Sequence, residues 1–101
     1  NLIEGEIKKI PSNVKLPHIG WNEVKFIKKD KVFNKIKNNK DFYFVHSYYF
    51  DCSDESNILG TTNYDFIFPS IIKKKNIYGF QFHPEKSLNN GLNLLSNFLK
   101  F

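Results

Sequence analysis

Residues 79–87, with the sequence GFQFHPEKS, join a predicted strand to the final helix and carry the most reactive pair of side chains in the chain. The apolar run 77–82 predicts a buried strand, and Pro84, which lacks an N–H for a sheet ladder, ends that strand at His83. Side chains two residues apart in extended backbone point to the same side, so His83 and Glu85 are expected to share a hydrogen bond. A carboxylate in this place fixes the imidazole tautomer and stabilises its charged form, as in a nucleophile–His–acid triad. The segment itself contains no nucleophile, and His-x-Glu spacing alone also arises by chance.

A C-terminal helix is predicted directly after this segment. Ser87 is placed to cap it, and leucines then recur at helical spacing. The predicted apolar stripe consists of Leu88, Leu92, Leu95 and Leu99, joined by Phe98. Gly91 within the helix costs ~1 kcal/mol relative to alanine, so we expect it to pack closely against a neighbouring element.

Several strands are predicted upstream of the segment. They are a lysine-rich edge strand at 6–10, a short strand at 24–27, a strand at 42–50, a strand at 58–64, and a hairpin of 66–72 with 77–82 around the lysine-rich turn 73–76. Both faces of 42–50 are largely apolar, which is typical of a central strand.

Two segments are predicted to be other than strands. Residues 31–37 predict a short amphipathic helix with Asp30 as its N-cap. Residues 16–22 contain a proline and a glycine and predict a loop. Composition alone favours Trp21, the single tryptophan, as a buried core residue.

Length and composition indicate one folded domain or a piece of one. The chain has 101 residues, of which 41% are hydrophobic and 17% aromatic, which excludes a disordered tail. It begins with Asn1 and lacks methionine, so we expect it to begin inside a longer protein. A single cysteine excludes an internal disulfide, and no targeting or membrane-spanning pattern is found, so the expected location is the cytoplasm.

The basic charge is weak evidence for a nucleic-acid partner. The net charge is +5, but the fifteen basic residues are all lysine, whereas arginine is favoured for forked contacts to bases and phosphates. An AT-rich coding bias explains these lysines about as well as a binding surface does.

Other reactive residue types do not form a recognisable site. Cys52 has acidic neighbours, which disfavour the thiolate that a nucleophile requires, and no glycine elbow surrounds it. His18 and His46 lack metal-ligand spacing, so neither a zinc site nor any cofactor is predicted. His46 lies within an apolar strand and is expected to be a hydrogen-bonded core residue.

The sequence resembles a known enzyme class. The QFHPE of residues 81–85 resembles the His-Pro-Glu signature of class I (triad) glutamine amidotransferases. Within that class the chain is similar, over nearly its whole length, to the glutaminase subunits of imidazole glycerol phosphate synthase. The matching motifs are LPHIGWN (16–22), FVHSY (44–48), GTT (60–62) and HPEKS (83–87), with Gly91, Leu94, Leu95, Asn97 and Phe98. The departures, Asp65-Phe66 and the lysines at the hairpin tip, lie in loops.

This resemblance implies a fold and a reaction. Residues 1–101 would be the C-terminal half of a flavodoxin-like α/β domain, a mixed sheet with a short helix and a C-terminal helix. The other half would supply the nucleophilic cysteine from a Gly-x-Cys-x-Gly elbow. His83 would act as general base and acid, Glu85 would orient it, and glutamine would be hydrolysed to glutamate and ammonia. Without its nucleophile, the chain by itself is expected to be inactive.

The resemblance also implies a partner. In that family the ammonia passes to a (β/α)8 cyclase subunit, which makes imidazole glycerol phosphate in histidine biosynthesis, and the two subunits form a heterodimer. The residues matching interface positions are Trp21, Asn22, Tyr43 and Lys86. Aromatic anchors and a lysine able to pair with a partner carboxylate suit such a contact, which favours an exposed Trp21.

Three alternatives stay open at this point. A paralogous amidotransferase could feed ammonia to another synthase, for example in surface-sugar biosynthesis. A non-catalytic module could use its lysines to contact an acidic partner. A nucleic-acid binder is the least favoured, and no membrane partner is predicted.

Overall fold

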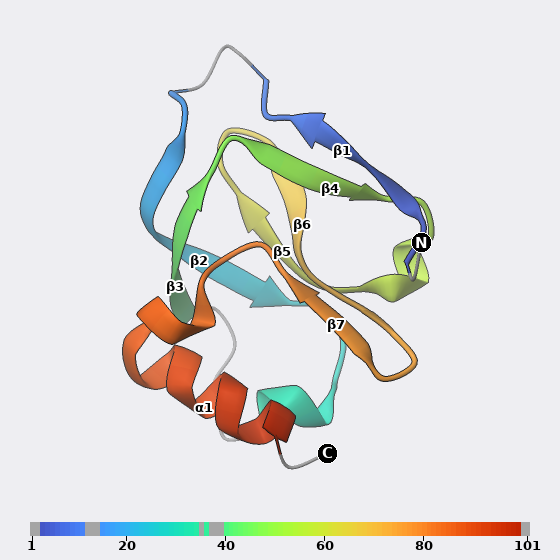
Figure 1. Ribbon diagram of the computed structural model, residues 1–101, viewed down its shortest axis with the longest axis vertical. Helices are drawn as coiled ribbons and strands as arrows, with labels where there is room; N and C mark the ends of the chain where they lie inside the picture. The colour runs from blue at the N-terminus through green and yellow to red at the C-terminus, as the bar shows by residue number, and fades with distance from the viewer. Residues whose placement is uncertain (1–2, 12–14, 35, 37–39, 100–101) are drawn as a thin grey trace.

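The computed structural model describes residues 3–11, 15–34, 36 and 40–99, which form two antiparallel sheets and a C-terminal helix (Figure 1). A two-stranded sheet pairs β1 (Gly5–Lys9) with β4 (Tyr48–Cys52). The five-stranded sheet has the order β3-β2-β5-β6-β7. Its strands are β2 (His18–Phe26), β3 (Lys40–His46), β5 (Ile58–Asn63), β6 (Ile67–Lys74) and β7 (Ile77–Phe80).

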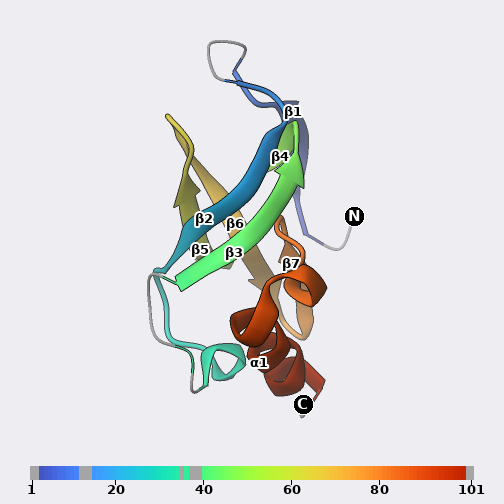
Figure 2. The same cartoon turned by 90° about the vertical axis from the view of Figure 1, so that its left-hand side faces the viewer.

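Helical elements are short except at the C-terminus. The described residues include three 3-10 turns. Of these, η1 (Lys31–Phe33) and η2 (Glu55–Asn57) lie between strands, and η3 (Pro84–Lys86) lies between β7 and α1. Helix α1 (Leu88–Leu99) lies at one end of the molecule beside η1, and β1 and β4 lie toward the other end (Figures 1 and 2). The predicted α/β class with a C-terminal helix is confirmed, but all strand pairs among the described residues are antiparallel, whereas the resemblance implies a mixed sheet.

The core lies between the five-stranded sheet, η1 and α1. It is built mainly from phenylalanine and branched aliphatic side chains: Val24, Val32, Phe33, Phe42, Phe44, Leu59, Phe68, Ile71, Phe82 and Leu94. Because these residues come from both sheet and helix, the helix and the sheet bury each other's apolar faces.

Several predicted elements are confirmed. The edge strand at β1, the strand at β5 and the β6–β7 hairpin are all present. Asp30 is the predicted N-cap, since its carboxylate accepts a 3.0 Å hydrogen bond from the Val32 amide. The helix that it caps is only the single turn η1, and positions 35 and 37 of the predicted helix lie outside the described residues.

The predicted loop at 16–22 is wrong, because β2 begins at His18. The strand pairs with β3 in the register His18↔His46 to Val24↔Lys40, and Gly20 takes a positive φ of 122° within it. Its inward positions include the polar His18 and Asn22, and its outward positions include the apolar Ile19 and Trp21. This reversal of the usual inside-outside pattern is why the sequence does not predict a strand.

The predicted central strand at 42–50 is also wrong. The chain bends at Ser47, so that β3 ends in the five-stranded sheet and β4 begins in the two-stranded one. The Ser47 carbonyl accepts a hydrogen bond from the Ile10 amide at the bend. In the described part of the chain, β3 is an edge strand with β2 on one side only. The apolar residues after the bend therefore serve a second sheet.

The predicted leucine stripe of α1 is wrong at Leu92, which is exposed. The helix instead buries Gly91, Leu94 and Asn97, with Leu95 half-buried. The side chains of Leu88, Phe98 and Leu99 lie outside the described set.

The buried face of α1 differs from the predicted leucine stripe because α1 packs on η3 through Gly91. A Cβ at that position would lie 1.8 Å from the Pro84 carbonyl oxygen, which confirms the predicted close approach. The amide of Asn97 holds the other end of this face, donating hydrogen bonds to the carbonyls of Val32 and Asn34.

Candidate active site

The backbone at His83 is shaped by the proline that follows it. Strand β7 ends at Phe80, three residues before the predicted end, and His83 has extended φ and ψ of −99° and 99°. Pro84 begins η3, since its fixed φ suits a first helical position. Glu85 therefore lies on a 3-10 turn and not on an extended segment, which corrects the backbone argument for the pair.

The predicted hydrogen bond between His83 and Glu85 is nevertheless formed. His83 Nδ1 lies 3.2 Å from Glu85 Oε2, and the side chains are 40% and 58% exposed. The backbone N–H of Glu85 itself, and then the hydrogen bond from His83, hold the pKa of Glu85 below its ordinary value. With the carboxylate charged, Nδ1 donates its proton to it and Nε2 keeps a lone pair. Among the described residues Nε2 has no hydrogen-bond partner, so it can take up a proton from an incoming group.

Hydrogen bonds from β3 hold the His83 backbone in place. The His83 amide donates to the Tyr43 carbonyl at 2.9 Å. The Tyr43 amide donates to Ser87 Oγ at 2.9 Å, and Ser87 Oγ donates to the His83 carbonyl at 2.7 Å. The prediction for Ser87 concerned only the capping of α1. Its bond to Tyr43 spans 44 positions and leaves no local sequence signal.

Trp21 and Tyr43 form an aromatic pair on the exposed side of β2 and β3. The two residues face each other in register, and their rings meet edge to face with centroids 5.6 Å apart. Trp21 is 49% exposed, so its prediction as a core residue is wrong. The exposed Ile19 and Val45 form the next cross-strand pair along the same face. We call these four residues the β2–β3 patch.

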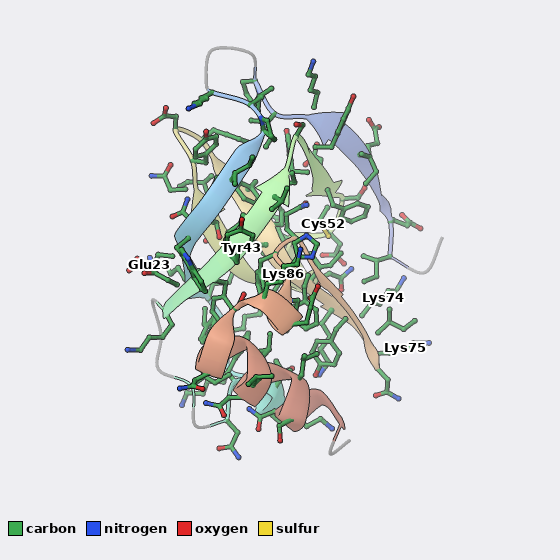
Figure 3. All side chains as sticks on the ribbon, turned by 60° about the vertical axis from the view of Figure 1, so that its left-hand side comes forward. Glu23, Tyr43, Cys52, Lys74, Lys75 and Lys86 are labelled. Atoms are coloured by element: carbon green, nitrogen blue, oxygen red, sulfur yellow. The ribbon has the colours of Figure 1, made fainter. Side chains whose placement is uncertain are left out.

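Of the other two candidate interface residues, Lys86 lies near this pair and Asn22 lies apart from it. Lys86 is exposed on η3 and directly precedes Ser87, whose Oγ accepts the hydrogen bond from the Tyr43 amide; Figure 3 labels Lys86 and Tyr43. Asn22 lies on the opposite side of β2 from Trp21, where its amide donates to His18 Nε2 at 3.2 Å and to the Asn63 carbonyl at 3.1 Å. The structure thus brings Trp21, Tyr43 and Lys86 to one region and directs Asn22 inward.

His18 and His46 form a hydrogen-bonded pair inside the sheet. His46 Nδ1 lies 2.8 Å from the Tyr48 carbonyl and must donate to it, so His46 Nε2 accepts from His18 Nδ1 at 2.9 Å. Burial, and then the neighbouring His46, lower the pKa of His18 to about 4, and burial also lowers the pKa of His46. Both rings are therefore neutral near pH 7. The prediction of His46 as a hydrogen-bonded core residue is confirmed for its hydrogen bonds, but His46 is half-buried and His18 is the buried member of the pair.

Cys52 is buried at the end of β4 and its thiol donates to the Asp54 carbonyl. It belongs to the two-stranded sheet, whereas His83 is held on β3 of the other sheet. In the described part of the chain, no three His, Cys, Asp or Glu side chains gather closely enough to hold a metal ion. No helix within the described ranges is long and apolar enough to cross a membrane.

Comparisons with known proteins agree with the resemblance. A family model described as class-I glutamine amidotransferase matches residues 4–101. The chain is 48% identical to imidazole glycerol phosphate synthase subunit HisH 1 of Methanococcus maripaludis, over 98% of this chain and 49% of that protein. It is 46% identical to subunit HisH of Moorella thermoacetica, over 97% of this chain and 47% of that protein. The chain spans about half the length of the curated relatives it matches.

A solved structure shows the same fold at low sequence identity. A Thermoplasma acidophilum protein described as a GMP synthase subunit superposes with a TM-score of 0.72 at 17% identity. The match covers 95% of this chain and 47% of that one. At this identity the likeness concerns the fold alone.

Proposed function

The chain belongs to the class-I glutamine amidotransferase family, and from this premise we propose that the complete protein hydrolyses glutamine to glutamate and ammonia. The single observation that carries the proposal is the His83–Glu85 hydrogen bond, which leaves Nε2 without a partner among the described residues. This chain would supply the base and its orienting carboxylate, while a segment outside it would supply the nucleophilic cysteine.

The proposed reaction uses His83 twice. Nε2 takes the thiol proton as the sulfur attacks the glutamine carboxamide carbon, and the imidazolium then gives that proton to the leaving nitrogen, releasing ammonia. Nε2 next takes a proton from water, whose oxygen attacks the thioester carbon. The C–S bond then breaks, and the imidazolium returns that proton to the departing sulfur, which gives glutamate, the free thiol and a neutral His83. Throughout, Glu85 accepts the Nδ1 proton and stabilises the imidazolium.

We place the missing half of the domain along β7. Among the strands described, β7 pairs with β6 alone, so its other edge can accept a further strand. A groove of about 220 Å³ beside it is lined by apolar groups that include Phe50, Ile72 and Phe80. His83 follows β7 by three residues, so a nucleophile carried by a half-domain seated there would approach it.

The names of the relatives suggest where the ammonia goes. We infer that it is delivered to a (β/α)8 cyclase subunit that makes imidazole glycerol phosphate in histidine biosynthesis, in the cytoplasm. The β2–β3 patch, with Lys86 near it, is the surface we assign to that subunit, because exposed aromatic residues beside a charge are typical of interface anchors. Asn22 would support this surface from inside, through its bond to the Asn63 carbonyl.

The test measures ammonia release from glutamine by the complete protein. We expect His83→Ala to lower kcat by roughly 10⁴-fold or more, and Glu85→Gln by up to about 10⁴-fold with little change in KM. Lys74→Ala, an exposed change in the β6–β7 hairpin, is the control and is expected to leave kcat unchanged.

Two results would contradict the proposal. If His83→Ala hydrolysed glutamine at the rate of the unchanged protein, the chain would instead belong to a non-catalytic module. If the enzyme were active but never increased product formation by the cyclase subunit, the acceptor would be a different synthase.

A further inference from the structure

Both backbone groups of Tyr43 are bound by the segment that carries His83. The Tyr43 carbonyl accepts from the His83 amide, and the Tyr43 amide donates to Ser87 Oγ. The Ser87 hydroxyl closes the ring by donating to the His83 carbonyl at 2.7 Å. The His83 segment thus occupies the edge of β3 where a neighbouring strand would otherwise bond.

The Ser87 side chain is suited to this place by its chemistry and its size. A hydroxyl is the smallest side-chain group that both donates and accepts a hydrogen bond, and Ser87 uses both capacities. The residue is 1% exposed, so water cannot replace either bond. Without the hydroxyl, the Tyr43 amide would lose its partner inside the protein, whereas the His83 carbonyl would keep only the Lys86 amide.

The surrounding backbone leaves Ser87 little freedom to move. Its amide donates to the Pro84 carbonyl, and its carbonyl accepts from the Gly91 amide at the start of α1. The close approach of Gly91 to Pro84 holds the helix against this turn. The start of α1 therefore fixes the position of the Ser87 hydroxyl, and this hydroxyl is hydrogen-bonded to the backbone of both Tyr43 on β3 and His83.

We propose that Ser87 is a positioning residue for the glutaminase reaction, because its hydroxyl fixes the backbone of His83 against Tyr43 and so directs the imidazole. The inference rests on the proposed function. Ser87 makes no contact with the His83 ring among the described hydrogen bonds and acts only through the main chain. Loss of its hydroxyl is expected to affect the rate of the chemical step more than the binding of glutamine.

The experiment compares Ser87→Ala with Thr62→Val in the complete protein. Thr62 is a matched control, because it is also buried, at 2% exposed, and its hydroxyl on β5 makes a 2.9 Å hydrogen bond to Ser70 Oγ and, among the described hydrogen bonds, none to the segment that carries His83. We expect Ser87→Ala to lower kcat on the order of 10- to 100-fold with KM for glutamine nearly unchanged. Thr62→Val is expected to keep its kcat, even where its melting temperature falls as far.

A second readout follows the nucleophile directly. In a Cys52→Ser background, the rate of iodoacetamide alkylation is measured against pH, since it reports the thiolate that a well-placed imidazolium stabilises. Ser87→Ala should shift this profile to higher pH, and Thr62→Val should not. A purely structural role for Ser87 would leave the profile where it is.

The outcomes separate the two proposals. If His83→Ala abolishes glutamine hydrolysis but Ser87→Ala matches Thr62→Val in kcat and in the alkylation profile, the positioning role is wrong and the proposed function stands. If His83→Ala has no effect, the proposed function itself fails. Should Ser87→Ala not fold, Ser87→Cys replaces the hydroxyl with a somewhat larger thiol that hydrogen-bonds more weakly, and an unchanged kcat there would overturn the inference.

Discussion

The buried ring of His18 makes the stability of the five-stranded sheet depend on the pH of the solution. The imidazole lies between the rings of Phe44 and Tyr64, at centroid distances of 4.9 and 4.0 Å. Asn22 and His46 occupy its two nitrogens. These hydrogen bonds require both histidine rings to be neutral. A second proton on His18 would occupy Nε2, the atom that accepts from Asn22, and would place a charge among aromatic groups.

We therefore predict that the complete protein loses stability as the solution becomes moderately acidic. The folded-state pKa of His18, about 4, lies below its ordinary value of 6.5, so the unfolded chain binds the proton more readily. The contribution of His18 is fully present above pH 6.5 and is lost as the pH falls from there through about 4.

Urea unfolding at pH 7.5, 6.0, 5.0 and 4.5 would measure this loss. His18→Gln keeps a polar side chain without the titration, and we expect it to flatten the slope of stability against pH in this range. An equal slope in both proteins would show that other groups cause the loss. The lowered carboxyl pKa values of Asp30, Asp54 and Glu85 act in the same direction but at lower pH.

At the scale of elements, Asp30 joins η1 to the β6–β7 hairpin. Besides capping η1, its carboxylate accepts from Tyr78 Oη and from Lys73 Nζ, each at 2.7 Å. Burial opposes the charge of Asp30, but hydrogen bonds from Lys73, the Val32 amide and Tyr78 outweigh it and hold the pKa of Asp30 below its ordinary value. One carboxylate thus ties together segments more than forty positions apart.

We predict that Asp30→Ala lowers the free energy of unfolding by roughly 2–3 kcal/mol, because a cap and charge-assisted hydrogen bonds are lost together. Asp54→Ala is the matched control, since Asp54 caps η2 in the same way but is exposed and bonds only within its own turn. Its expected cost is clearly smaller than that of Asp30→Ala. Urea unfolding at pH 7 compares the two, and equal costs would show that the tie to the hairpin adds nothing.

Gly91 decides how α1 sits on η3. We predict that Gly91→Ala destabilises the protein, although alanine is the better helix former by ~1 kcal/mol, because its Cβ would overlap the Pro84 carbonyl. We also expect lower glutaminase activity, since Pro84 is joined to His83.

Thermal unfolding and ammonia release measure both effects. Leu92→Ala, on the exposed side of the same helix, is expected to change the free energy of unfolding by no more than about 0.5 kcal/mol. A Gly91→Ala protein as stable and active as the unchanged one would mean that α1 can shift without disturbing η3.

At the scale of the whole molecule, the β2–β3 patch and the segment that carries His83 meet at one residue of β3, Tyr43. Tyr43 contributes its ring to the patch and its backbone to His83. The acid–base pair therefore neighbours the surface assigned to the synthase subunit, which suits a reaction whose small product passes to a second site.

We predict that Trp21→Ala weakens association with the synthase subunit by at least 2 kcal/mol, about 30-fold in Kd, because a central tryptophan is a typical interface anchor. Its half-exposed position means that folding should be little affected. Titration calorimetry measures Kd, and Ile67→Ala, an exposed apolar change on β6, is the control. An unchanged Kd would place the partner on another surface.

Local patterns in the sequence were sufficient where partners lie a few positions apart. The His83–Glu85 pair, the Asp30 cap, the β6–β7 hairpin and the family signature each depend on neighbouring residues. The close approach at Gly91 could also be predicted, because a glycine within a helix needs a reason. Each of these features can be predicted from the types of residues within one turn or one hairpin.

The tertiary structure decided what depends on distant partners. Strand β2 exists because β3 and β5 pair with it, although its polar residues face inward and its apolar residues face out. The bend at Ser47, the turned face of α1 and the ring of bonds at Ser87 follow from contacts with β1, η3 and Tyr43. Periodicity reports which side of an element is apolar, but hydrogen bonds between segments forty positions apart depend on how the chain packs, and only the folded molecule determines them.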